Sequence, residues 1–232
     1  MLTARREAEL EKVRLACTRP EDHLCLAYDV TQAENHQPSL EKILSRFGSL
    51  DAVVLNAGIG QRGSVLESKT DVERQIMEVN YFATTELAKT VLPHFVERNA
   101  GQFVVISSIM GFVATPRRAT YSASKHALQG YFEGLRAELN QTNITISILC
   151  PGYIRTDISI SAKMGAGNSF GYMDKQHENA MASDVFARKA VRGLEKEKAV
   201  LFIGGPERFG PLLARLSPGL VRFLLPKVIT RE

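Results

Sequence analysis

The chain has 232 residues, of which 44% are hydrophobic and 23% are charged, and its formal net charge is +4. This composition excludes a disordered or fibrous protein and predicts one globular domain over residues 1–232. Basic and acidic residues alternate along most of the chain, so no nucleic-acid partner is expected. The N-terminus is charged and no apolar run reaches about 18 residues, so neither a signal peptide nor a membrane span is predicted, and cytoplasmic localisation is expected.

Helices and strands are predicted to alternate along the chain. A helical pattern at 5–16 precedes an apolar strand at 24–28, and a second helix at 39–47 ends at Gly48, which suits a left-handed cap. Further strands are predicted at 52–55, 103–106, 144–150 and 200–203, with helices at 71–98, 120–141 and 184–196. The strands are short and apolar on both faces, as in a parallel sheet covered by helices on each side. The predicted fold class is a doubly wound, three-layer α/β/α domain.

Two segments depart from this alternation. Residues 157–182 mix glycines with large apolar side chains after a strand's C-terminal end, which predicts a mobile apolar lid over the substrate. Residues 207–232 form a basic, amphipathic C-terminal tail. We favour a tail helix packed over the core or a neighbouring subunit; peripheral contact with a membrane is the less favoured alternative.

The residues with the clearest chemical meaning are Tyr121 and Lys125. Four places apart on a helix, they share one face, so the ammonium group can lie near the phenol and lower its pKa from about 10. Such a phenol could protonate a carbonyl oxygen near neutral pH. A Tyr–Lys pair alone is more often structural than catalytic. However, Ser108 follows a predicted strand directly, at the edge where ligand sites of this architecture lie.

Several further motifs occur in a familiar order. Asn56-Ala57-Gly58 follows a predicted strand, Asn80 lies in the next helix, Ser108 lies 13 positions before Tyr121, and the chain continues through Pro151-Gly152-Tyr153-Ile154-Arg155-Thr156. Together these segments resemble the short-chain dehydrogenase/reductase family, with its Rossmann-like fold, from residue 1 to about Thr156. The resemblance implies an oxidoreductase that is a homodimer or homotetramer.

The resemblance also assigns catalytic roles. Tyr121 would be the general acid in reduction and the base in oxidation, and Ser108 would orient the substrate carbonyl. Lys125 would lower the pKa of Tyr121 and bind the nicotinamide ribose, while Asn80 would hold a water that links Lys125 to solvent. The cofactor would supply the hydride.

Cofactor-binding positions follow from the same resemblance. NAD enzymes of the family carry a carboxylate near the end of the second strand, where this chain has Ala4 followed by Arg5, so NADP(H) is favoured over NAD(H). The alternative is that Arg5 is only a solvated residue at a helix start. The other implied cofactor-binding residues, besides Tyr121 and Lys125, are Asp29, Val30, Asn56, Ala57, Gly58, Pro151, Gly152, Ile154 and Thr156.

The chain departs from the family at its start. It has no Gly-rich turn for the pyrophosphate, so the fold is expected to be N-terminally truncated and to leave an open apolar sheet edge. A mis-set start codon, a shortened gene product and a partner chain that supplies the missing part are competing explanations, and we favour the first.

The sequence therefore predicts NADP-dependent hydride transfer to a ketone or aldehyde, or from a secondary alcohol, with an apolar, lipid-like substrate. The alternative is a non-catalytic interaction protein of the same fold that has lost nucleotide binding. No metal is expected, because the histidines show no ligand spacing with Cys, Asp or Glu.

Overall fold

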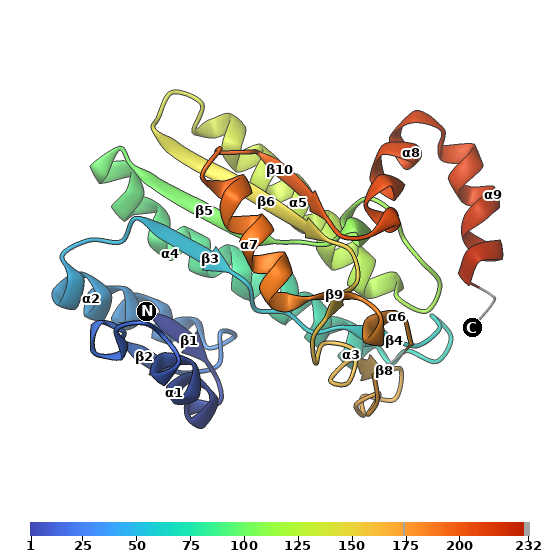
Figure 1. The fold of residues 1–232 in the computed structure, drawn as a ribbon, viewed down its shortest axis with the longest axis horizontal. Helices are drawn as coiled ribbons and strands as arrows, with labels where there is room; N and C mark the ends of the chain where they lie inside the picture. Colours follow the sequence, from blue (N-terminus) through green and yellow to red (C-terminus); the bar gives the residue numbers. More distant parts are fainter. Residues whose placement is uncertain (174, 230–232) are drawn as a thin grey trace.

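The computed structural model describes residues 1–173 and 175–229, and strands and helices alternate over most of this length (Figure 1). The strands are β1 (Leu2–Ala4), β2 (Cys25–Ala27), β3 (Ala52–Leu55), β4 (Gln61–Arg62), β5 (Gly101–Ile106), β6 (Ile144–Pro151), β7 (Ile154–Arg155), β8 (Lys163–Met164), β9 (Met181–Ala182) and β10 (Val200–Ile203). The helices are α1 (Glu7–Leu15), α2 (His36–Phe47), α3 (Thr70–Met77), α4 (Ala83–Arg98), α5 (Ala119–Glu138), α6 (Lys175–Glu178), α7 (Ser183–Leu194), α8 (Gly210–Leu216) and α9 (Pro218–Ile229).

A four-stranded parallel sheet forms the centre of the molecule. Its strand order is β10-β6-β5-β3, and every neighbouring pair is parallel. β5 and β6 pair over six residues and occupy the middle of the sheet. The predicted α/β fold class with a parallel, Rossmann-like sheet is confirmed.

Helices cover both faces of this sheet, because its central strands are apolar on both sides. Phe103 and Val105 of β5 pack with apolar residues of α4 and α5, whereas Val104 packs on the opposite face with Ala190 of α7. In Figure 1, α7 lies in front of the sheet, and α4 and α5 lie behind it. Successive side chains of a strand point to opposite faces, so one run of apolar residues supports two cores.

The N-terminal strands form a separate pair. β1 and β2 are parallel and hydrogen-bonded to each other, and they lie apart from the four-stranded sheet (Figure 1). β3 and β10 are the edge strands of the larger sheet, and Val54 of β3 is 58% exposed.

The long helix predicted at 71–98 is not continuous. A π-helical segment, η3 (Glu78–Phe82), separates α3 from α4 and carries the fully buried Asn80. Single π turns are frequent at functional sites, because the wider turn redirects one side chain. Apolar periodicity does not reveal such a turn, since the apolar face continues on both sides of it.

The segment predicted as a lid contains short regular elements. β8 pairs with β4 and β9 pairs with β7, so hydrogen bonds tie parts of 157–182 to the rest of the chain. Residue 174 of this segment lies outside the described part.

The tail forms α8 and α9, which extend away from the sheet (Figure 1). Leu212, Leu216 and Leu220 are 57%, 74% and 43% exposed, whereas Pro211 and Val221 are buried, so this chain covers only part of the tail. Residues 230–232 of the predicted tail lie outside the described part. Within 1–173 and 175–229, no helix combines the length and apolarity that crossing a bilayer requires.

Candidate active site

A pocket of about 310 Å³ lies where β3, β5 and β6 end. Open parallel sheets bind ligands at this edge, because the loops after the strands meet there. The structure brings nine of the predicted site residues into its lining: Asn56, Gly58, Ser108, Tyr121, Lys125, Pro151, Gly152, Ile154 and Thr156.

Ser108 is placed by the end of β5. Its hydroxyl oxygen accepts a hydrogen bond from the backbone N–H of Met110 at 3.1 Å, which caps the short helical turn at 109–111. The hydroxyl itself donates to the backbone carbonyl of Pro151 at 3.5 Å. Backbone groups at the ends of β5 and β6 therefore position the serine hydroxyl.

Tyr121 and Lys125 lie on one face of α5 and line the same pocket. The ammonium nitrogen of Lys125 is 5.8 Å from the centroid of the Tyr121 ring, and it donates to the backbone carbonyl of Ile106 at 2.9 Å. Both side chains are buried, with exposed fractions of 8% and 4%. One helical turn thus places a phenol and an ammonium group at the same end of the sheet.

The pKa of Tyr121 differs from the sequence prediction. Burial raises the pKa of this phenol above its usual value, while the side chain of Ser108 and the charge of Arg118 act in the opposite direction. The predicted lowering by Lys125 is wrong for this arrangement, because the ammonium group donates to Ile106 rather than to the phenol. The raised pKa keeps the phenol protonated near neutral pH.

Burial has the opposite effect on Lys125 and lowers its pKa from 10.5 to about 8. The ammonium group has three N–H donors, and one of them is used by the carbonyl of Ile106. Two donors thus remain for a ligand in the pocket. This donor set fits the hydroxyls of a cofactor ribose, the role that the family resemblance gives to Lys125.

Asn80 lies behind the pocket wall rather than in it. Its side-chain oxygen accepts from the backbone N–H of Ile59 at 2.8 Å, and its amide donates to the carbonyl of Ile59 and to the hydroxyl of Ser124. Gly58 lies between Asn80 and Lys125, since a Cβ there would be 3.4 Å from the Asn80 side-chain oxygen and 3.6 Å from the lysine nitrogen. Asn80 therefore anchors the loop after β3, and Ala57 belongs to the same loop.

The residues predicted to bind the adenosine half lie outside this pocket, at the ends of β1 and β2. Arg5 forms a 3.7 Å ion pair with Asp29, and the arginine side chain is 70% exposed. Burial opposes the ionisation of Asp29, but hydrogen bonds from Thr31 and the charge of Arg5 leave its pKa below the usual value. The carbonyl of Val30 is within 2.9 Å of the His36 ring nitrogen.

The segment after β6 is held from the far side by Glu207. This carboxylate accepts from the backbone N–H groups of Tyr153 and Gly205, at 3.1 and 2.8 Å. A Cβ on Gly152 would meet the same carboxylate, so a larger residue at this position would displace the Glu207 side chain. Glu207 thereby connects the pocket rim with the start of the tail.

Gln61 is a site residue that sequence reasoning missed. Its side chain is 1% exposed, and its oxygen accepts from the backbone N–H of Tyr121 at 3.1 Å. Its amide nitrogen donates to the hydroxyls of Ser68 and Thr120. No pattern in the sequence marks this glutamine, because its partners are 7 and about 60 positions away.

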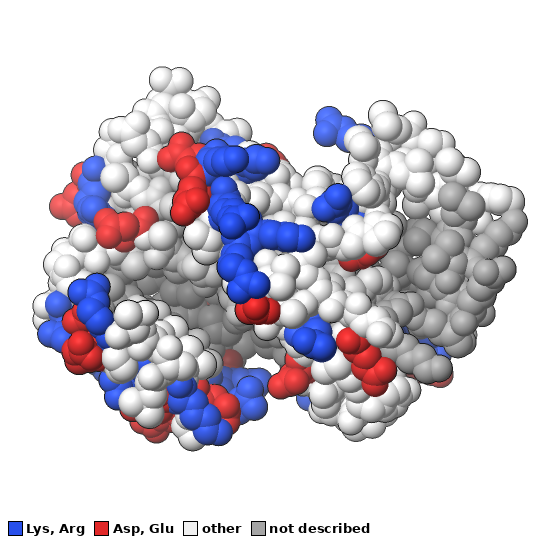
Figure 2. Space-filling model, viewed as in Figure 1, with Lys and Arg blue, Asp and Glu red and all other residues white. Residues whose placement is uncertain are grey.

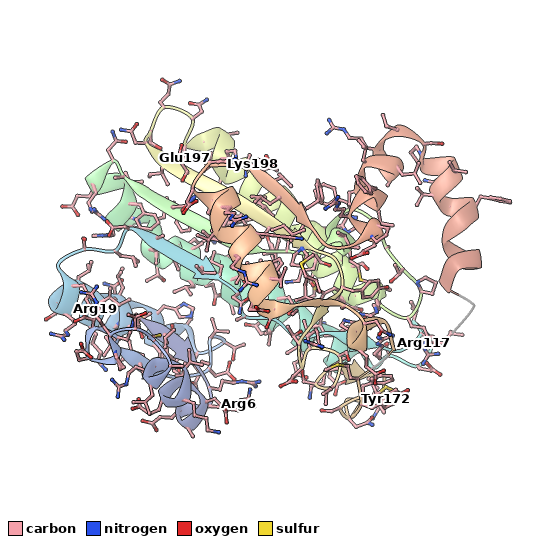
Figure 3. All side chains as sticks on the ribbon, in the orientation of Figure 1. Arg6, Arg19, Arg117, Tyr172, Glu197 and Lys198 are labelled. Carbon is pink, nitrogen blue, oxygen red and sulfur yellow. The ribbon has the colours of Figure 1, made fainter. Side chains whose placement is uncertain are left out.

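The 157–182 segment contributes one side of the pocket. Ile158 and Ala162 line it, and the ring of His177 meets that of Tyr153 edge to face at 5.3 Å. His177 is another lining residue that the sequence did not single out. Tyr172, in contrast, lies at the outer end of the segment and is 60% exposed (Figure 3).

The polar groups of the pocket include the hydroxyl of Ser108, the phenol of Tyr121 and the ammonium group of Lys125, beside mostly apolar walls. Such a set can orient and protonate a carbonyl oxygen. In the described part of the chain, no three His, Cys, Asp or Glu side chains gather closely enough to hold a metal ion.

Comparison with known families matches residues 1–165 to the model described as short chain dehydrogenase. The chain belongs to the short-chain dehydrogenase/reductase family. Dehydrogenase/reductase SDR family member 7B of Xenopus laevis is 35% identical over 213 residues, which cover 91% of this chain and 66% of that protein. This chain thus spans 66% of the length of that relative.

Solved structures of the family support the fold. A short-chain dehydrogenase from Streptomyces avermitilis superposes with a TM-score of 0.79 at 26% identity, covering 99% of this chain and 87% of that one. ElxO with NADP bound superposes with a TM-score of 0.63 at 30% identity, covering 67% of this chain and 63% of that one.

Proposed function

We propose that this short-chain dehydrogenase/reductase transfers a hydride between NADP(H) and a ketone, aldehyde or secondary alcohol of apolar character. The observation that carries the proposal is the meeting of Ser108, Tyr121 and Lys125 at one end of the sheet, inside one pocket. The apolar side chains of Ile154, Ile158 and Phe186 around this triad favour an apolar, lipid-like substrate.

In reduction, Ser108 and Tyr121 bind the substrate carbonyl oxygen with their hydroxyls. As the carbonyl carbon gains a hydride, which the nicotinamide supplies, the phenol proton of Tyr121 moves to the oxygen and an alcohol forms. Because burial raises its pKa, Tyr121 holds this proton at neutral pH. Lys125 would bind the ribose hydroxyls with its two remaining N–H donors, and Gln61 holds the start of α5 in place.

Arg5 supports the choice of NADP(H) over NAD(H). It follows Ala4 at the end of β1, so no carboxylate occupies the position that would repel a 2′-phosphate. Its guanidinium group is 70% exposed and can pair with a phosphate. The bound NADP in the ElxO structure fits this choice.

A non-catalytic interaction protein remains the rival function. The observation in its favour is that β1 and β2 share no ladder with the four-stranded sheet, so the adenosine-binding residues lie on a separate strand pair. An interaction protein predicts no saturable NADPH binding, which fluorescence titration measures directly.

The catalytic test is Tyr121→Phe. We expect carbonyl-dependent oxidation of NADPH to fall by about 100-fold or more, while NADPH binding and the melting temperature change little. The control is Phe112→Tyr, which adds a hydroxyl to a partly exposed ring instead of removing one. This variant should retain activity. Retained reductase activity in Tyr121→Phe would rule out this phenol as the acid.

A further inference from the structure

The tail carries an exposed apolar stripe. Phe209, Leu212, Leu213 and Leu216 are 58%, 57%, 37% and 74% exposed. These positions are three and four places apart, so they share one side of α8, while Pro211 on another side is buried. Leu220 continues the exposed apolar surface into α9.

Cations border this stripe without any acid among them. Arg208 and Arg215 lie one turn on either side of Leu212, and both are exposed. Residues 208–229 contain no Asp or Glu. In Figure 2, the surface of α8 is mostly white with blue atoms beside it, and Lys and Arg side chains gather over α7 on the same face of the molecule.

We propose that α8 and the start of α9 bind the surface of an anionic lipid bilayer. The leucine stripe enters the boundary between headgroups and acyl chains, and the flanking arginines reach the anionic headgroups. The helix then lies in the plane of the interface and does not cross the bilayer.

Charge favours lipid over a second copy of the chain as the occupant. In a two-fold dimer, the stripe of one copy would face the stripe of the other, bringing Arg208 and Arg215 of both copies together. Residues 208–229 provide no carboxylate to pair with them, so such a contact would be repulsive. An anionic bilayer supplies the missing negative charge.

The proposed surface adjoins the pocket. Glu207, directly before the stripe, binds the backbone N–H of Tyr153 at the pocket rim. Membrane binding would therefore hold the rim close to the lipid. No residue of α8 lines the pocket, so vesicle binding can be measured independently of turnover.

The experiment is sedimentation of the full chain with two kinds of vesicle, phosphatidylcholine alone and phosphatidylcholine with an equal part of phosphatidylserine. We expect binding to the anionic vesicles that weakens as salt is added. Arg208→Gln and Arg215→Gln should each weaken this binding about fivefold. Leu212→Ser and Leu216→Ser should each weaken it about tenfold or more.

Matched controls lie elsewhere on the surface. Leu66 is 99% exposed and Arg46 is exposed on α2, so Leu66→Ser and Arg46→Gln repeat the same changes away from the tail and should leave vesicle binding unchanged. All six replaced side chains are exposed, so the melting temperature should change little and shows whether each variant is folded.

Three results would overturn the proposal. They are absence of binding to anionic vesicles, equal binding to both kinds of vesicle, and equal effects of the tail and control variants. Light scattering measures the oligomeric state and so tests whether a second copy of the chain covers α8 instead of lipid. A dimer that Leu212→Ser dissociates, in a protein that binds no vesicles, would assign α8 to a second copy.

Discussion

The β5–β6 pair and the β1–β2 pair are both parallel and built from short apolar segments, but they are buried to different extents. Phe103, Val105 and Ile148 of β5 and β6 are 0% exposed, whereas β1 and β2 contain no buried residue. The centre is covered by α4 and α5 on one face and α7 on the other; among the residues of α1, only Leu10 is buried.

This difference separates the two halves of the proposed site. Ser108, Tyr121 and Lys125 are held by buried strands and a buried helix face, which restricts their motion. Arg5 and Asp29 lie on the exposed strand pair. We therefore expect changes in the centre to alter stability and catalysis strongly, and changes in the N-terminal pair to have small, local effects.

The largest expected effect comes from the centre. Phe103 packs edge to face on Phe95, with ring centroids 4.9 Å apart, and Phe103→Ala should lower the free energy of unfolding by about 3–5 kcal/mol. Leu26→Ala in β2 removes a half-buried side chain and should cost about 1 kcal/mol. Urea unfolding measures both, and equal losses would contradict the comparison.

Burying the charged side chain of Lys125 lowers the stability of the folded protein, and Lys125→Met tests this effect. Since its pKa is about 8 when folded and 10.5 in the reference state, the unfolded chain binds the proton more tightly between these pH values. Stability should therefore rise with pH through this window. Below pH 8, Lys125→Met should raise the free energy of unfolding by up to about 3 kcal/mol, and the gain should vanish near pH 10.5.

Urea unfolding near pH 7 and near pH 10.5 tests this prediction. Lys196→Met, at an exposed lysine of the loop after α7, is the control and should show no such pH dependence. A gain in stability that is independent of pH would mean that burial does not shift the pKa of Lys125.

An intermediate effect is expected from Gln61, which connects the loop after β3 with the backbone of Tyr121. Gln61→Ala should lower kcat about tenfold, because the start of α5 loses a buried hydrogen-bond acceptor, while the affinity for NADPH stays the same. Gln102→Ala removes a partly buried glutamine at the opposite end of β5 and should leave kcat unchanged. Equal losses of kcat in Gln61→Ala and Gln102→Ala would mean that both changes destabilise the whole fold, and that Gln61 has no specific role in positioning Tyr121.

The smallest effect is expected from the exposed strand pair. Arg5→Ala should weaken NADPH binding about fivefold and leave NADH binding unchanged, because only NADPH carries the 2′-phosphate. Ala4→Asp should reverse the preference by adding the repelling carboxylate. Fluorescence titration measures both affinities, and an equal loss for NADPH and NADH would exclude a contact with the 2′-phosphate.

Local patterns in the sequence were sufficient for much of the fold and of the pocket. The strands at 52–55 and 200–203 have the predicted limits, and Gly48 ends α2 with a left-handed φ of 79°. Helical spacing alone placed Tyr121 and Lys125 on one face of α5. These features depend on residues close together in the chain, so periodicity and capping residues are enough to predict them.

Tertiary structure decided the rest. The raised pKa of Tyr121, the buried acceptor of Gln61 and the π turn at Asn80 all arise from groups that are distant in sequence but adjacent in space. The same is true of the tail, where an apolar stripe that fits a packed helix in the sequence is exposed in the fold. The sequence by itself determined which residues could carry the chemistry. Burial and the partners of each polar group, which depend on how distant segments pack, determined their protonation and which surfaces remain open.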